Sequence, residues 1–352
     1  MIVYVIDGME ITDLVEVFES LIWNVQFWDV SDFELAVPAT ERNMDALQVG
    51  RRLVLERDID TGTYRNVMQI ESRALRHDAE AGWVLTLTGS GLKKMVGQRI
   101  VWSQTNLTGT VEAGIRQVIT ENIISPVNAA RAIPNFILAN AAGIADTFET
   151  QLFGDNIAAW LTTICPQYGI GWDVYISGGK YVFELKKGTD RSYNQTAVPA
   201  VVFSPEYDNL LSNTYTYSRA DYKNAALVGG EGEGTSKRTA EVGTAAGLDR
   251  FEAYIDGGSV SSNGDIITLA QYIELLKTYG QEQLVGTAFN EKFEGEIAPY
   301  GLYSLGEDYF LGDIVQIVND HGIRATSRIL EIIYSEDRNG SAYTPTFSEW
   351  EV

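Results

Sequence analysis

The sequence predicts a mainly β protein with α+β insertions, in which two similar β-barrel domains carry additional α+β domains. Three observations lead to this prediction. Short strand-like runs fill both ends of the chain, a helical period dominates only the middle, and the two β-rich ends resemble each other. With 352 residues, of which 45% are hydrophobic and 11% aromatic, the chain is long and apolar enough to fold several cores.

Residues 1–104 are expected to form the first β-barrel. Its runs of β-branched and aromatic residues are separated by turn residues, and Asp60-Thr61-Gly62 is typical of a tight hairpin. A short helix is expected after the last strand, at residues 91–95. The predicted strands are Leu21–Phe27, Asp32–Val37, Arg51–Glu56, Tyr64–Glu71 and Trp83–Thr88.

Residues 105–203 are expected to form an α+β domain. Thr110 can cap a helix whose apolar residues fall on one face before Pro126. A second helix is predicted at Asn156–Cys165, where Pro166 stops it. The paired glycines 178 and 179 then predict a hairpin between strands 171–176 and 180–186.

Residues 204–230 and 300–352 are expected to form the second β-barrel, interrupted by an insertion at 231–299. The insertion starts at a glycine-rich loop, Gly229–Gly234, and continues with a strand at Arg250–Ile255 and a helix at Leu269–Gln283. Asn339-Gly340 signals a hairpin before the last strand. The barrel strands are predicted at Asn213–Arg219, Asn224–Val228, Asp313–Val318 and Arg324–Tyr334.

The two predicted barrels align with each other in two blocks. Residues 20–29 align without gaps on residues 212–221, and Gly50–Asp58 aligns on Gly312–Asp320, with Gly62 close to Gly322. The larger offset of the second block implies that the second copy contains the insertion. Chance similarity between two antiparallel barrels is the alternative. If the repeat is real, three chains can present six similar units in a ring.

Several blocks resemble siphophage tail-hub proteins. They lie at both ends of the chain: Ser20–Trp23, Asp32–Pro38, Val54–Asp58, Leu85–Leu92, Arg99–Val101, Asp221–Gly234, Arg250–Glu252 and Tyr309–Val315. The resemblance implies a structural, non-enzymatic hub made of two barrels related to tail-tube domains. It also implies a homotrimer around a central channel, located at the virion tail tip and made in the cytoplasm of the bacterial host.

The same resemblance implies the partners. They are a distal tail protein or tail-tube ring on one side, and a tail fibre, spike or other tip protein on the other. The tape measure protein and the ejected DNA would pass through the channel. The formal charge of −22 disfavours specific nucleic-acid binding and suits a wall past which DNA slides.

No residue pattern predicts a cofactor, a metal or catalysis. Gly229–Gly234 lacks the lysine of a phosphate-binding loop, and the two histidines have no ligand set beside them. No signal peptide or membrane span is expected, and a single cysteine, Cys165, excludes an internal disulfide. The residues chosen as possible channel or interface loops are Asp58, Asp60, Gly62, Glu231 and Glu233.

Two alternatives stay open at this point. Tyrosine and tryptophan platforms on a β architecture could bind sugars, which predicts a carbohydrate- or receptor-binding tail module. Paired acids such as Glu231 and Glu233 could serve a secreted glycosidase, although 48 acidic residues make such pairs common by chance.

Overall fold

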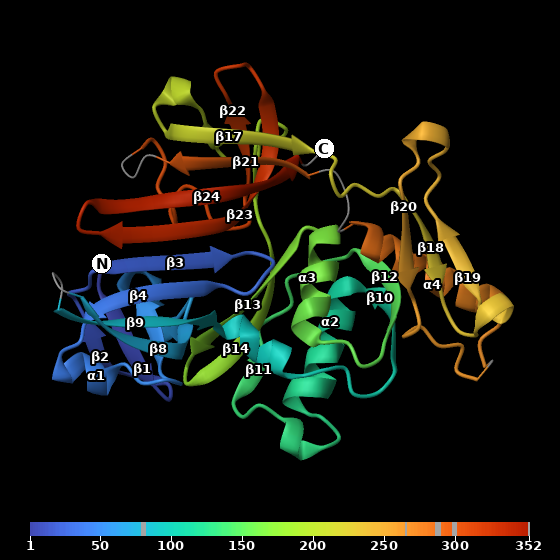
Figure 1. Cartoon of the computed structure of the whole chain (residues 1–352), viewed down its shortest axis with the longest axis horizontal. Coiled ribbons are helices and arrows are strands. Elements are labelled where there is room, and N and C mark those ends of the chain that lie inside the picture. The colour runs from blue at the N-terminus through green and yellow to red at the C-terminus, as the bar shows by residue number, and fades with distance from the viewer. Residues whose placement is uncertain (79–81, 265, 286–289, 298–300, 351–352) are drawn as a thin grey trace.

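The computed structural model describes residues 1–78, 82–264, 266–285, 290–297 and 301–350. One sheet of 14 strands runs through both ends of the chain (Figure 1). The strand order along its main path is β17-β21-β24-β23-β3-β4-β9-β8-β5-β1-β2. A branch starts at β23, which also pairs with β22, and β22 in turn pairs with β15 and β16. Smaller sheets and the α-helices lie beside this sheet (Figure 1).

The N-terminal unit contributes the seven strands from β3 to β2. Residues on β3 alternate between the core and the other face, and Leu21, Trp23 and Val25 are the buried ones. Thr40 caps the short helix α1 by accepting a hydrogen bond from the Asn43 amide. The elements are β1 Val3–Asp7, β2 Glu10–Val15, β3 Ser20–Gln26, β4 Asp32–Pro38, α1 Glu41–Ala46, β5 Arg52–Leu55, β8 Met68–Asp78 and β9 Gly82–Gly91.

The C-terminal unit contributes the strands on the other side of β3. Phe203, Ile317 and Phe347 lie at the centre of its core, which is separate from that of the first unit. Its elements are β15 Asp190–Arg191, β16 Val202–Phe203, β17 Leu210–Ser218, β21 Asn290–Ile297, β22 Ile314–Val318, β23 Arg324–Asp337 and β24 Gly340–Trp350.

The two units share strand order and register, which confirms the internal repeat. The path β3-β4-β9-β8-β5 of the first unit corresponds to β17-β21-β24-β23-β22 of the second. The aligned glycines Gly50 and Gly312 both have positive φ, at 91° and 95°. Each donates a 2.8 Å backbone hydrogen bond, Gly50 to Ile70 and Gly312 to Ile329. A β-bulge follows Ile70 in one unit and Ile329 in the other.

The units are joined within the chain by pairing of β3 with β23. Seven residue pairs form this antiparallel junction, and Trp23 lies opposite Tyr334 at its buried centre. The Phe27 amide extends the junction by donating to the Leu330 carbonyl at 2.7 Å. The second unit therefore continues the sheet of the first.

Residues 92–187 form an α+β domain against this junction. Thr110 caps α2 by accepting from the Ala113 amide at 3.3 Å, as predicted. Pro166 lies inside the last turn of α3 rather than after it. The elements are β10 Thr105–Thr110, α2 Val111–Ile119, β11 Phe136–Leu138, β12 Thr147–Leu152, α3 Ile157–Gln167, β13 Ile170–Ser177 and β14 Lys180–Lys187. β6 Ile59–Asp60 and β7 Thr63–Tyr64 from the first unit complete its main sheet.

The insertion forms a small separate layer on the right of Figure 1. Three strands in the order β19-β18-β20 are covered on one face by α4, which also contacts α3 and β12. Gly280 of α4 allows close approach, because a Cβ there would lie 2.4 Å from the Val228 side chain. The elements are β18 Ala225–Gly229, β19 Thr239–Val242, β20 Glu252–Asp256 and α4 Leu269–Val285, so the predicted strand and helix are confirmed.

The main sheet stays open in the residues that the structure describes, so closure into barrels remains a prediction. Several segments lie across the predicted domain boundaries. β18, expected in the second barrel, belongs to the sheet of the insertion, and β21, expected in the insertion, pairs with β17 and β24 of the main sheet. Leu92, Val96 and Val101 belong to the core of the α+β domain. The strands β15 and β16 pair with β22 of the second unit. Among the described helices, none has the length and apolarity that a membrane crossing requires.

Candidate functional site

The large sheet has two long exposed edges. Beyond Gln69, where β8 leaves β5, no described strand pairs with the outer edge of β8. Likewise, β17 pairs with β21 on one side and with no described strand on the other. Both edges expose apolar side chains, since Leu75 on β8 is 49% exposed and Leu211 on β17 is 57% exposed. A long strand edge whose backbone groups are unpaired invites pairing with another chain.

These open edges correspond to the two edges already joined inside the chain. By the repeat, β8 is the counterpart of β23, and β17 is the counterpart of β3. The alignment places Tyr215 at the position of Trp23. The equivalent bulges after Ile70 and Ile329 place Leu75 at the position of Tyr334. Within the chain, β3 and β23 pair with each other, whereas the equivalent edges of β17 and β8 pair with no described strand.

Phe27 and Lys93 hold the α+β domain against the junction. The Phe27 ring fits between two glycines, because a Cβ on Gly171 or on Gly312 would lie 2.1 Å from it. The Lys93 amine is buried and donates to the backbone carbonyls of Gln26, Phe27 and Asp29 at 2.6, 3.0 and 3.0 Å. Burial lowers the pKa of Lys93 to about 7. One amine therefore fixes the segment that follows β3.

The hairpin that contains Asp58, Asp60 and Gly62 lies where the first unit contacts the α+β domain. Its strand β7 pairs with β13 of the α+β domain, and the Gly62 carbonyl accepts from the Gly178 amide at 3.1 Å. Asp60 is exposed and caps the turn by accepting from the Thr61 amide. The hairpin therefore attaches the first unit to the α+β domain.

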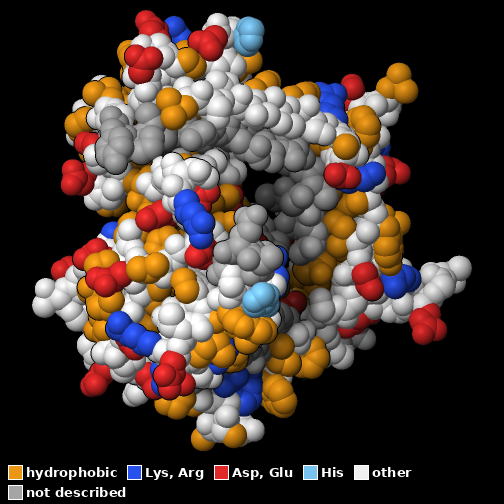
Figure 2. All heavy atoms as spheres, turned by 60° about the vertical axis from the view of Figure 1, so that its left-hand side comes forward, with side chains coloured by type: hydrophobic (Ala, Val, Ile, Leu, Met, Phe, Trp, Pro, Cys, Tyr) orange, Lys and Arg blue, Asp and Glu red, His pale blue; other side chains and the backbone are white. Residues whose placement is uncertain are grey.

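Asp58 borders a cavity of about 740 Å³ between the three domains. Its Oδ1 accepts from Asn66 at 2.8 Å, while its Oδ2 lies 3.6 Å from the Arg57 guanidinium. Burial raises the pKa of the Asp58 carboxyl, and Arg57 offsets this only partly. The Arg57 guanidinium also lies over the Tyr343 ring of the second unit. Figure 2 shows this face of the molecule hollowed between its upper and lower parts.

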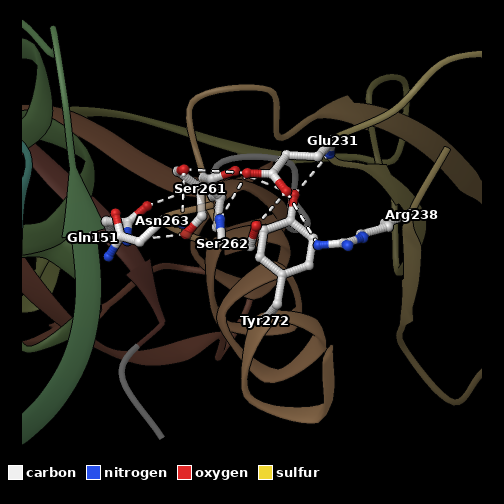
Figure 3. Close-up of polar contacts among 8 residues, drawn as sticks. Gln151, Glu231, Arg238, Ser261, Ser262, Asn263 and Tyr272 are labelled. Atoms are coloured by element: carbon white, nitrogen blue, oxygen red, sulfur yellow. Dashed lines mark hydrogen bonds and ion pairs between the residues drawn. The ribbon is translucent and has the colours of Figure 1, made fainter. Parts of the chain in front are cut away.

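Glu231 is half-buried and anchors the glycine-rich loop (Figure 3). Its carboxylate accepts from the Ser262 amide and hydroxyl, both at 2.7 Å, from Ser261, and from Arg238 at 3.2 Å. Partial burial works against ionisation, but the hydrogen bonds from Ser262 and Ser261 prevail and lower the pKa of Glu231. Ser261 in turn bonds to Gln151 of β12 at 2.6 Å, which ties the insertion to the α+β domain.

The structure does not bring the predicted residues together. Asp58 lies where the first unit contacts the α+β domain, and Glu231 lies where the insertion contacts it. Glu233 is exposed. The open edges of β8 and β17 were missed as a site. The repeat aligned β17 with β3, but only the structure shows that β3 is paired on both sides and β17 on one.

Among the described residues, no set of three His, Cys, Asp or Glu side chains could hold a metal ion. Cys165 is buried, and burial raises the pKa of its thiol far above the ordinary value.

A buried acid lies where the insertion docks on the α+β domain. Glu282 of α4 is buried, hydrogen bonds to Thr150 of β12 and lies near Asp155. Burial, and to a smaller extent the charge of Asp155, raise the pKa of Glu282 to about 7. Because the folded protein disfavours the ionised carboxylate, stability is lost as the pH rises from 4.5 through 7.

Glu282→Gln is therefore expected to raise the midpoint of urea unfolding at pH 8, by up to about 3 kcal/mol in free energy. The gain should shrink to about 0.4 kcal/mol at pH 4.5, where the carboxyl is protonated in the folded chain and half protonated in the unfolded chain. Glu274→Gln is the matched control, since Glu274 is an exposed acid of the same helix, paired with Lys277. An equal gain at both pH values would contradict the assignment.

The fold is similar to that of solved phage tail proteins over nearly the whole chain. The tail protein from Neisseria meningitidis MC58 has a TM-score of 0.58 at 14% identity, with 99% of this chain and 96% of that chain covered. The 43 kDa tail protein of prophage MuSo2 from Shewanella oneidensis has a TM-score of 0.58 at 12% identity, covering 99% and 98%. Prophage tail protein gp18 from Listeria monocytogenes EGD-e has a TM-score of 0.54 at 12% identity, covering 99% and 94%.

At these identities the likeness shows the fold alone. No curated protein matches the sequence. A family model described as Siphovirus ReqiPepy6 Gp37-like protein matches residues 2–347, so the resemblance to siphophage proteins is confirmed along nearly the full sequence. The chain belongs to the family of siphovirus ReqiPepy6 Gp37-like proteins.

Proposed function

We propose that this protein is a structural hub of a siphophage tail tip, in which three copies close a ring of six similar units. One observation carries the proposal. The β3–β23 junction joins two units within the chain, and the exposed edges of β8 and β17 are the counterparts of the strands in that junction. The similar fold of solved tail proteins supports the proposed location in a phage tail.

In the proposed ring, β17 of one copy pairs antiparallel with β8 of the next copy. The register of the internal junction then places Leu75 opposite Tyr215, as Tyr334 lies opposite Trp23 within the chain. The two surfaces differ, so the contact is heterologous and gives a ring when the rotation closes. Six similar units would match a sixfold tail tube or distal tail ring, and three identical copies would match a fibre or spike.

The proposed ring surrounds a channel and performs no catalysis. Tube-like barrel walls would be completed only when neighbouring copies extend the open sheets. The net charge of −22 favours a wall that repels DNA, so that DNA and the tape measure protein can pass without sticking. The proposed location is the tail tip of the virion, after synthesis in the bacterial cytoplasm.

Light scattering across a concentration series, with negative-stain images, tests this proposal. The expected mass is three times the 38.9 kDa of one chain, in rings with a central hole. A chain that stays monomeric even when mixed with its tail neighbours would contradict the hub. Glycan binding by such a monomer would favour a receptor-binding module instead.

A further inference from the structure

The α+β domain carries an exposed patch that the ring does not use. We name it the arginine–tryptophan patch and define it by Arg99, Ile100, Trp102, Arg131 and Phe153. The Arg131 guanidinium lies 4.7 Å from the centre of the Trp102 ring and donates to the Ile100 carbonyl at 2.7 Å. Arg99 donates to the Arg131 carbonyl at 2.6 Å. These contacts make the two arginines and the tryptophan one continuous surface.

Phe153 lies on the segment that follows β12, and this segment runs beside the one that carries Trp102. Residues 99–102 and 153–156 run side by side, since the Gly154 amide donates to the Val101 carbonyl and the Val101 amide to the Asp155 carbonyl, both at 2.9 Å. Val101 faces the core, which turns its neighbour outward: Trp102 is 61% exposed, and Phe153 is 56% exposed. Two large aromatic side chains on adjacent segments are therefore exposed to water.

The charge of the patch is also uncompensated. Neither Arg99 nor Arg131 has a carboxylate within 4.0 Å among the described residues. Arg99 donates to the carbonyls of Gln98 and Arg131, and Arg131 donates to the Ile100 carbonyl and the Asn122 side chain. Burial, followed by the charge of Arg99, lowers the pKa of Arg131. Two adjacent cations without an acid stand out in a chain of net charge −22.

We propose that the arginine–tryptophan patch docks a protein segment that presents carboxylates next to an aromatic or aliphatic anchor. Tryptophan and arginine are the residues that dominate the energy of protein interfaces, and an Asp or Glu would supply the missing partner for each guanidinium. A nucleic acid fits less well. Two cations give little attraction for phosphates in a chain whose net charge is −22. Arg131 also covers one face of the Trp102 ring, on which a base would otherwise stack.

The test uses the full chain and three fluorescent probes of equal length. One is a 12-residue peptide of Asp, Glu, Phe and Leu, the second replaces its acids by Lys, and the third is oligothymidine. The acidic peptide should bind more tightly than the other two. Arg99→Glu with Arg131→Glu should weaken its binding by roughly 100-fold, about tenfold for each charge-assisted contact. Trp102→Ala should weaken it by about tenfold or more.

Arg42→Glu with Arg338→Glu is the matched control, because it makes the same charge change at two exposed arginines elsewhere. This control should bind the acidic peptide as the unchanged chain does. Equal binding of the lysine peptide, preferential binding of oligothymidine, or no binding of the acidic peptide would each overturn the proposal. Because the patch lies outside the β8 and β17 edges, these outcomes do not depend on ring formation.

Discussion

A chain with Leu75→Glu is expected to keep its fold and lose its ring. Leu75 is half-exposed on the outer part of β8, so a glutamate there is tolerated in the single chain. In the ring the same side chain would be buried opposite Tyr215. The loss of the apolar contact and the burial of an unpaired carboxylate should cost about 3 kcal/mol per junction. That cost lowers the association constant by roughly 100-fold.

Sedimentation velocity at several concentrations would measure this effect, with circular dichroism to check the fold. Leu248→Glu is the matched control, since Leu248 is 99% exposed and belongs to the insertion, outside the strands β8 and β17. The control should assemble as the unchanged chain does. Normal assembly of the Leu75→Glu chain would show that β8 is not the joining edge.

Lys93→Ala is expected to cause the largest loss of stability of any single substitution proposed for this chain. It removes the donor that three backbone carbonyls share, and each buried carbonyl left without a partner costs about 1–3 kcal/mol. Some will find water or shift, so a loss of about 3–5 kcal/mol is expected. Urea unfolding followed by tryptophan fluorescence would report it, because Lys93 lies 5.0 Å from the centre of the Trp172 ring.

Lys94→Ala is the adjacent control. Lys94 is exposed and pairs with Glu71, so its loss should cost less than about 1 kcal/mol. A comparable loss for both variants would show that the three carbonyls do not depend on Lys93.

The pH dependence of Lys93 gives an independent check. The pKa of the amine is about 7 in the folded chain and 10.5 as its ordinary value, so the unfolded chain binds the extra proton between these values. Its contribution therefore makes stability rise as the pH increases from 7 to 10.5. Lys93→Met should remove this rise, and an unchanged pH profile would contradict the burial of the amine.

Local patterns in the sequence were sufficient to predict most of the strands and the repeat. Aspartate, asparagine and glycine mark turns through their own backbone preferences, so the hairpins at Gly62 and Gly340 could be read directly. The equivalence of Gly50 and Gly312 rests on the same physics, since both turns require a positive φ. The pairing of β3 with β23 could not be predicted from the sequence. It joins residues about 300 positions apart, and register at that distance is set by packing.

The candidate site was predicted less well, for a related reason. Glu231 was chosen because it lies in an acidic, glycine-rich loop, which is typical of a mobile surface. Its role depends on Ser261 and Ser262, which are 30 residues away in the chain but supply the donors that its carboxylate accepts. Composition shows that an acid is present, and only the fold shows whether donors surround it.

The most direct test of the ring is a disulfide between neighbouring copies. The proposed register places Arg76 opposite Thr214 on the next chain, as Ser335 lies opposite Ile22 within the chain. The chain with Arg76→Cys and Thr214→Cys should form a covalent trimer under mild oxidation, with no background from the buried Cys165. Each single-cysteine chain should stay uncrosslinked. If the double variant gives no interchain disulfide under conditions where the chains associate, the pairing of β8 with β17 is wrong.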